Sequence, residues 1–356
     1  MADRKTTYAR ARRLIAEKLA DPLNMPDSDV NLTEAYCLSA ETLEGYSTLD
    51  WQMRQTIRRL GTSIRAYWNA PQRKRPLCIF LLAGPGSGKS YLVERLSKSL
   101  KNPNTAFEEY NLTAMHSPQD LEGVLQKIRD LKVSDENPVL FLDEIDSKPS
   151  NYAMLLPLMW DGALQISDRL VQIGKCVIVL AASSGDLESV VAEVQDPEKL
   201  DIHQYGKIPD FISRIGGGVH QIPDLELQSA GRDRRADKVC MAISLLQKRF
   251  GDDLVSFPWP LLAFVARARF RFGARSISRF MESFELHGEV KTDVTAAQLQ
   301  LPLGSSQDLA DSSFSSHLCM AAGGSPVDVW SAVESNNVQV VIDPKACEEI
   351  LDALKP

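Results

Sequence analysis

The sequence predicts an α/β fold in which a mostly parallel sheet has helices on both faces and is followed by a small all-α domain. Two observations predict the sheet. Short apolar runs, typical of strands buried on both faces, alternate with amphipathic helical segments between residues 77 and 182. Polar side chains follow directly after these runs, where parallel sheets bind ligands. Amphipathic helices without buried strands predict the second domain over residues 224–290.

The first apolar run, Leu77–Leu82, leads into a glycine-rich turn and a helix. A loop that wraps phosphates directs several backbone N–H groups inward, which glycine allows at low conformational cost, and a helix N-terminus favours an anion. The residues expected around the phosphates are Gly84, Pro85, Gly86, Ser87, Gly88, Lys89, Ser90 and Tyr91. They fit the pattern G-x-x-x-x-G-K-[ST] except at its first position, Ala83. Lys89 is expected on the β- and γ-phosphates and Ser90 on Mg²⁺.

A second apolar run, residues 139–142, ends in the two carboxylates Asp143 and Glu144. Asp143 lies 54 residues after Lys89, which leaves room for a crossover helix and another strand. Adjacent carboxylates at a strand end suit two tasks, coordination of Mg²⁺ by Asp143 and polarisation of an attacking water by Glu144. The two segments in this order predict a P-loop NTPase that uses ATP and Mg²⁺.

The other elements of the predicted core are assigned from periodicity and turn residues. An apolar stripe predicts a helix over about residues 48–68, and residues 107–112 predict a strand. Ser117 and Pro118 begin a further helix, and Asp161-Gly162 ends the next one. A last buried strand, Val177–Ala182, delivers Ser183 and Ser184 to the same sheet edge as Asp143.

Composition shifts divide the chain into four segments. We expect a helical extension over residues 1–75, the nucleotide-binding core over 76–222, a helical lid over 223–303, and a linker with a small α/β tail over 304–356. Arginine-rich residues 3–20 predict the first helix. Helices of the lid are predicted over residues 235–250, 260–271 and 274–287, and the tail over 326–354 combines helices with one strand.

Composition favours an ordinary cytoplasmic globular protein. The net charge is −7, yet residues 1–76 carry 13 Lys and Arg against 9 Asp and Glu, so a nucleic-acid contact stays open for that segment. The six cysteines are scattered without a C-x-x-C pair, which favours reduced thiols over a metal site. No stretch is long and apolar enough to predict a membrane span.

The order of these motifs resembles the AAA+ ATPases over about residues 76–290. The resemblance implies that Ser184, or its neighbour Ser183, positions the attacking water as sensor 1. Residues 207–215 look like the arginine-finger segment of Clp-type unfoldases, which places Arg214 at the γ-phosphate of a neighbouring subunit. Gly273-Ala274-Arg275 looks like sensor 2, with Arg275 on the phosphates of its own subunit. A homo-oligomer, commonly a hexameric ring or spiral, is implied.

The main functional expectation is an oligomeric AAA+ ATPase that remodels or switches a protein partner. Residues 113–118 lack the aromatic-hydrophobic-glycine pattern of the pore loop in threading unfoldases, which argues against processive unfolding. Two alternatives remain open, a DNA-linked ATPase of the clamp-loader or initiator type and a nucleotide-gated assembly scaffold. Other candidates for the trans contact are Arg232, Arg234 and Arg235.

Overall fold

The computed structural model describes two compact units, Gln55–Pro223, and Met1–Arg54 together with Asp224–Pro356. The described residues are 30–31, 41–43, 46–48, 51–100, 104–148, 150–183, 207–225, 228–229, 232–233, 235–250, 256–257, 265, 270, 272–282, 285–286 and 299–300. The elements predicted over residues 3–20 and 326–354, and nearly all of 260–271, lie outside them. Within the described ranges, no helix is long and apolar enough to cross a membrane.

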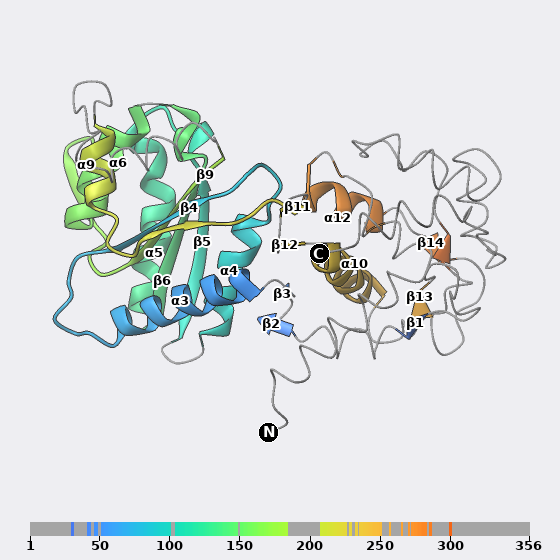
Figure 1. Ribbon diagram of the computed structural model, residues 1–356. Helices are drawn as coiled ribbons and strands as arrows, with labels where there is room; N and C mark the ends of the chain where they lie inside the picture. The colour runs from blue at the N-terminus through green and yellow to red at the C-terminus, as the bar shows by residue number, and fades with distance from the viewer. Residues whose placement is uncertain are drawn as a thin grey trace. The chain divides into compact units, whose positions relative to one another are not determined.

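The unit Gln55–Pro223 is built on a five-stranded, fully parallel sheet (Figure 1). The spatial order of the strands is β10-β4-β9-β6-β5. Their bounds are Leu77–Leu82 for β4, Thr105–Asn111 for β5, Asn137–Asp143 for β6, Val177–Ala182 for β9 and Val219–Gln221 for β10. This arrangement confirms the predicted parallel α/β fold.

The register of the strands brings the predicted functional residues to one edge. Leu82 at the end of β4 pairs with Ala182 at the end of β9, and Leu142 on β6 pairs with Leu180. Asn111 at the end of β5 pairs with Asp143. Because the strands are parallel, the segments that follow them all leave the sheet on the same side.

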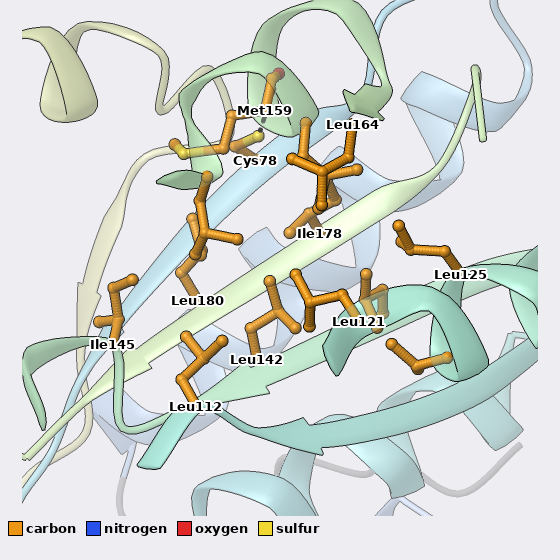
Figure 2. Close-up of a cluster of buried hydrophobic side chains, with 14 of the residues drawn as sticks. Cys78, Leu112, Leu121, Leu125, Leu142, Ile145, Met159, Leu164, Ile178 and Leu180 are labelled. Atoms are coloured by element: carbon orange, nitrogen blue, oxygen red, sulfur yellow. Dashed lines mark hydrogen bonds between the residues drawn. The ribbon is translucent and has the colours of Figure 1, made fainter. Parts of the chain in front are cut away.

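Helices cover both faces of this sheet. Alternate strand residues, among them Cys78, Leu142, Ile178 and Leu180, form a buried cluster with side chains of α5 (Glu122–Val133) and α6 (Ser150–Asp161) (Figure 2). The helix α4 (Lys89–Ser99) contacts β5 and β6 but contributes no residue to that cluster, so it covers the opposite face.

The structure contains two features of this unit that the sequence analysis missed. An antiparallel hairpin, β7 (Ala163–Ile166) and β8 (Arg169–Gln172), lies between α6 and β9. The edge strand β10 follows the short helix α9 (Ile208–Ser213) and three glycines. A Cβ on Gly217 would lie 2.4 Å from Cγ1 of Ile79, so this approach to β4 requires glycine.

The helix α3 (Trp51–Trp68) precedes β4, the first strand of the sheet along the chain. Its buried stripe is Met53, Ile57, Leu60, Ile64 and Tyr67. The Tyr67 hydroxyl accepts from the backbone N–H of Cys176 at 2.8 Å and lies 3.0 Å from the carbonyl oxygen of Arg75. Burial of Tyr67 raises the pKa of its hydroxyl, and burial raises the pKa of the Cys176 thiol to about 12. One protonated phenol therefore ties α3 to the beginnings of β4 and β9.

The other unit contains two packed helices, α10 (Arg235–Phe250) and α12 (Ala274–Glu282). The helix predicted over residues 274–287 is shorter in the structure and ends at Glu282. At this end Arg249 donates a hydrogen bond to the carbonyl oxygen of Met281 at 3.2 Å. Its described residues also form short antiparallel pairs, β1 (Val30–Asn31) with β13 (Ser256–Phe257), β2 (Glu41–Leu43) with β3 (Tyr46–Ser47), β11 (Gln228–Ser229) with β12 (Arg232–Asp233), and β14 (Glu285–Leu286) with β15 (Leu299–Gln300).

Replacing Tyr67 by Phe tests the anchoring of α3. We expect Tyr67→Phe to lower the free energy of unfolding by about 1–3 kcal/mol, because the buried N–H of Cys176 loses its acceptor. Urea denaturation followed by circular dichroism measures the change. The matched control is Tyr110→Phe on β5, whose hydroxyl has no hydrogen-bond partner in the described part of the chain. An equal loss in both variants would contradict the anchoring role.

Candidate functional site

The loop between β4 and α4 has the backbone of an anion cradle. Gly86 and Gly88 both adopt positive φ, 74° and 80°, and the Ser87 N–H donates to the carbonyl oxygen of Gly84 at 3.2 Å. These left-handed conformations turn the chain so that it enters α4 at Lys89. Residues without a side chain are needed here because L side chains rarely adopt such values.

Three observations on this loop fit a bound phosphate group. No side chain of the described residues caps the N-terminus of α4, so its first N–H groups are open to a ligand. The Ser87 hydroxyl is buried without a hydrogen-bond partner among the described residues. A Cβ built on Gly84 or Gly88 would meet no heavy atom of the described chain within 4 Å beyond its chain neighbours. The loop therefore offers both space and unused donors.

Lys89 is held at the centre of this edge of the sheet by three groups of the chain. Its ammonium is buried and donates to the Ser183 hydroxyl at 2.6 Å and to the carbonyl oxygen of Ala83 at 3.4 Å. It also forms an ion pair with Asp143 Oδ1 at 3.6 Å. The charge of a buried ammonium is stabilised by such partners, and phosphate oxygens could replace them as acceptors.

Glu144 follows β6 in a strained backbone conformation. Its φ of 57° and ψ of 45° lie in the left-handed region, which a Glu rarely occupies and which costs about 1–3 kcal/mol. Its Oε1 accepts from the Ser183 hydroxyl at 3.2 Å, and its own N–H donates to Asp143 Oδ1 at 3.0 Å. The Glu144 carboxylate is therefore held beside Ser183, just beyond the end of β6.

Asp146 fixes the opposite side of the same network. Its Oδ2 accepts from the backbone N–H of Ser183 at 3.1 Å. Ser183 is thereby held from its backbone by Asp146, while its hydroxyl joins Lys89 to Glu144. Partial burial raises the pKa of Glu109 on β5, and the nearby Asp143 and Glu94 carboxylates raise it further.

The structure brings together Lys89, Asp143, Glu144 and Ser183, the last of which the sequence analysis named as the alternative to Ser184. Ser90 and Tyr91 lie in the first turn of α4, and Tyr91 stacks with the Arg95 guanidinium at 4.8 Å from its ring centroid. Ser184 lies outside the described residues, so only Ser183 can be placed in contact with Glu144. Sequence reasoning missed Asp146, although its place two residues after Glu144 was a usable signal.

Arg214 lies at the other end of β4, away from this edge. It directly follows α9, and its Nη1 donates to the carbonyl oxygen of Asp210 at 3.1 Å. Gly217, three residues later, donates to the carbonyl oxygen of Cys78 near the start of β4 at 2.8 Å. Figure 1 shows α9 beside α6, on the side of the sheet away from α4.

The other arginines named in the sequence analysis belong to the unit that contains α10 and α12. Arg275 is exposed in the first turn of α12, and its backbone N–H donates to the carbonyl oxygen of Phe272 at 3.1 Å. Its contact with phosphates stays a prediction. Arg232 lies on β12 and Arg235 begins α10, while Arg234 lies outside the described residues.

The loop after β5 is tied to the segment that follows Glu144. Lys148 donates to the carbonyl oxygens of Thr113 at 3.1 Å and Met115 at 2.6 Å. Asp120 accepts from the backbone N–H groups of His116 and Ser117 at 2.8 and 2.9 Å, and these bonds lower the pKa of its carboxyl. Residues 113–117 therefore form an ordered loop held from both sides.

Comparison with protein families identifies the part of the chain that contains this edge. Residues 79–198 match the model of the ATPase family associated with various cellular activities (AAA). The matched range begins in β4 and extends past Ser183, so it contains Lys89, Asp143 and Glu144 but ends before Arg214.

Replacing Asp146 tests whether Ser183 is positioned from its backbone. We expect Asp146→Ala to lower the turnover of a nucleoside triphosphate about tenfold to a hundredfold, because the Ser183 hydroxyl is no longer aligned. The dissociation constant for the nucleotide, measured by fluorescence titration, should stay within about twofold, a change of about 0.4 kcal/mol, because Asp146 accepts its hydrogen bond from Ser183 and not from the phosphate loop. Asp146→Asn keeps an acceptor and should retain more activity. Equal losses in the two variants would contradict a positioning role.

Proposed function

Because residues 79–198 are a domain of the AAA ATPase family, we propose that this chain hydrolyses ATP with Mg²⁺ at sites shared between copies, to remodel or switch a protein partner. The observation that carries the proposal is the convergence of Lys89, Asp143, Glu144 and Ser183 beside an open, glycine-rich helix N-terminus. A protein that only binds nucleotide has no need for the second carboxylate.

Binding uses the loop and the residues that already hold Lys89. The backbone N–H groups at the start of α4 receive phosphate oxygens, and Lys89 transfers its hydrogen bonds from Ser183 and Ala83 to the β- and γ-phosphates. Ser90 and Asp143 would hold Mg²⁺, which when bound neutralises charge on the phosphate oxygens. Release of Lys89 from Asp143 leaves that carboxylate free for the cation.

Hydrolysis is assigned to Glu144 and Ser183. Glu144 accepts a hydrogen bond from the attacking water and orients it toward the γ-phosphorus. Ser183, once released by Lys89, keeps its contact with the Glu144 carboxylate and fixes its direction. The strained backbone of Glu144 places this carboxylate beyond the end of β6, on the ligand side of the sheet.

The position of Arg214 supports a site shared between two copies. The six residues of β4 span about 20 Å, and Arg214 lies near the start of this strand while the phosphate loop follows its end. Arg214 therefore acts on the nucleotide of a second copy, where its positive charge offsets negative charge developed in the transition state. A closed ring or a spiral, with six copies as the expected number, satisfies this geometry at every site.

Coupling to a protein partner follows from the same arrangement. A guanidinium that contacts the γ-phosphate of the next copy is sensitive to whether ATP or ADP is present there, so hydrolysis changes the interface between copies. Arg275 on α12 is proposed to contact the nucleotide of its own copy. The ordered loop 113–117 is connected through Lys148 to the segment after Glu144, and it is the described loop best placed to transmit the change.

Two variants test the shared site. Arg214→Ala should bind ATP normally and hydrolyse it about a thousandfold more slowly, because the guanidinium stabilises the transition state and not bound ATP. Glu144→Gln should bind ATP without turnover. The rate per wild-type subunit should rise with protein concentration in step with the mass measured by light scattering. The matched control is Arg129→Ala, an exposed arginine on α5, which should hydrolyse ATP at the wild-type rate.

Mixing these variants decides between a shared and a self-contained site. In a mixture, the Glu144→Gln subunit donates Arg214 to an Arg214→Ala subunit that keeps Glu144. Activity should therefore reappear when the two inactive proteins are combined. A fully active monomer, with Arg214→Ala at the wild-type rate, would overturn the shared site.

A further inference from the structure

An exposed tryptophan lies between two arginines at the amino end of β4. Trp160, in the last turn of α6, is 43% exposed. The Arg75 guanidinium lies over its ring at 4.0 Å from the centroid, and the Arg214 guanidinium lies over it at 5.9 Å. Three segments far apart in the sequence thus meet at a single aromatic ring.

The backbone next to Trp160 and the backbone at Arg75 are both held by the core of the unit. Trp160 directly follows Met159, which is buried and accepts a hydrogen bond from the Cys78 thiol at 3.5 Å. The carbonyl oxygen of Arg75 lies 3.0 Å from the buried Tyr67 hydroxyl. Arg214, in contrast, has a single side-chain hydrogen bond among the described residues, to the Asp210 carbonyl oxygen. The aromatic face is therefore the rigid partner of a long, flexible side chain.

The positive charge at this place is not neutralised within the described chain. Neither Arg75 nor Arg214 has a carboxylate oxygen within 4.0 Å among the described residues. The carboxylate closest in sequence to Arg214, Asp210, pairs with Lys207 at 3.5 Å. Two like charges over one ring repel each other, and the ring quadrupole offsets part of this cost. An anion bound at the exposed face of this cluster would offset the remaining repulsion between the two guanidinium groups.

We propose that Trp160 is a positioning residue for Arg214 and that Arg75, Trp160 and Arg214 form the surface that meets the triphosphate of a second copy of this chain. The inference rests on the proposed shared site. The ring holds the Arg214 guanidinium in a limited set of rotamers before the copies meet, so less conformational freedom is lost on contact. Arg75 adds a second positive charge beside the Arg214 guanidinium, which enters the nucleotide site of the second copy.

The proposal is tested by changing the ring while Arg214 stays intact. Trp160→Leu should lower kcat about twofold to fivefold, the factor that corresponds to one exposed cation–π contact, with an unchanged KM for ATP. Trp160→Phe keeps an aromatic face and should restore most of kcat. Thermal unfolding of each variant shows that the folded fraction is unchanged at the assay temperature. Arg75→Ala should lower kcat in the same direction, and Arg73→Ala, which removes the same charge two residues earlier, should not.

Mixing separates a role at the neighbouring site from a role in the subunit's own fold. Glu144→Gln subunits carry an intact ring and Arg214, so adding them to Trp160→Leu should raise the activity per Trp160→Leu subunit toward the wild-type value. If Arg214→Ala recovers in such a mixture and Trp160→Leu stays slow, or if Trp160→Leu has the wild-type kcat alone, the positioning role is overturned. If Arg214→Ala itself does not recover, the shared site has failed and the positioning role fails with it.

Discussion

The buried strand β4 is the constraint on which the rest of the nucleotide unit depends. All six of its residues are buried, and it is paired on one side with β9 over its full length and on the other with β10. A shift of one residue in the register of this strand would turn each apolar side chain to the opposite packed face, where it would meet different neighbours. It therefore fixes the phosphate loop at its carboxyl end and the Arg214 segment near its amino end.

At the carboxyl end, polar groups satisfy one another until a ligand takes their place. Lys89 is held by Ser183 and Asp143, Ser183 is held by Asp146, and Glu144 occupies a strained backbone conformation. A buried ammonium without these partners would be costly. In the proposed function the same groups bind phosphate, metal and water, so little rearrangement is needed on binding.

At the amino end, the structure offers charge without a described internal partner. Arg75 and Arg214 share the ring of Trp160, and the core holds that ring through its neighbour Met159. In the proposed function, the two ends of this strand contribute to different nucleotide sites, the phosphate loop to the site of its own copy and Arg214 to that of a second copy.

Long apolar runs made the central strands predictable from sequence, and the glycine-rich turn between β4 and α4 was predicted with them. Both Leu77–Leu82 and Val177–Ala182 have the predicted bounds, because uninterrupted apolar runs bounded by turns leave few alternatives. The strand β10 was missed because Val219–Gln221 has no apolar run and depends on backbone pairing with β4. The hairpin β7–β8 was missed because its strands are short and its pattern is weak. The contacts of Asp146 with Ser183 and of Trp160 with Arg75 and Arg214 are tertiary, and periodicity does not reveal them.

The most direct measurement is a structure of Glu144→Gln with ATP and Mg²⁺ bound. We expect the phosphates in the loop 84–90, with Lys89 moved from Ser183 to the β- and γ-phosphate oxygens. We also expect the Arg214 guanidinium of each copy within hydrogen-bond distance of the γ-phosphate of the next. A nucleotide bound away from this loop, or an isolated copy with Arg214 in solvent and ATP fully enclosed, would contradict the shared site.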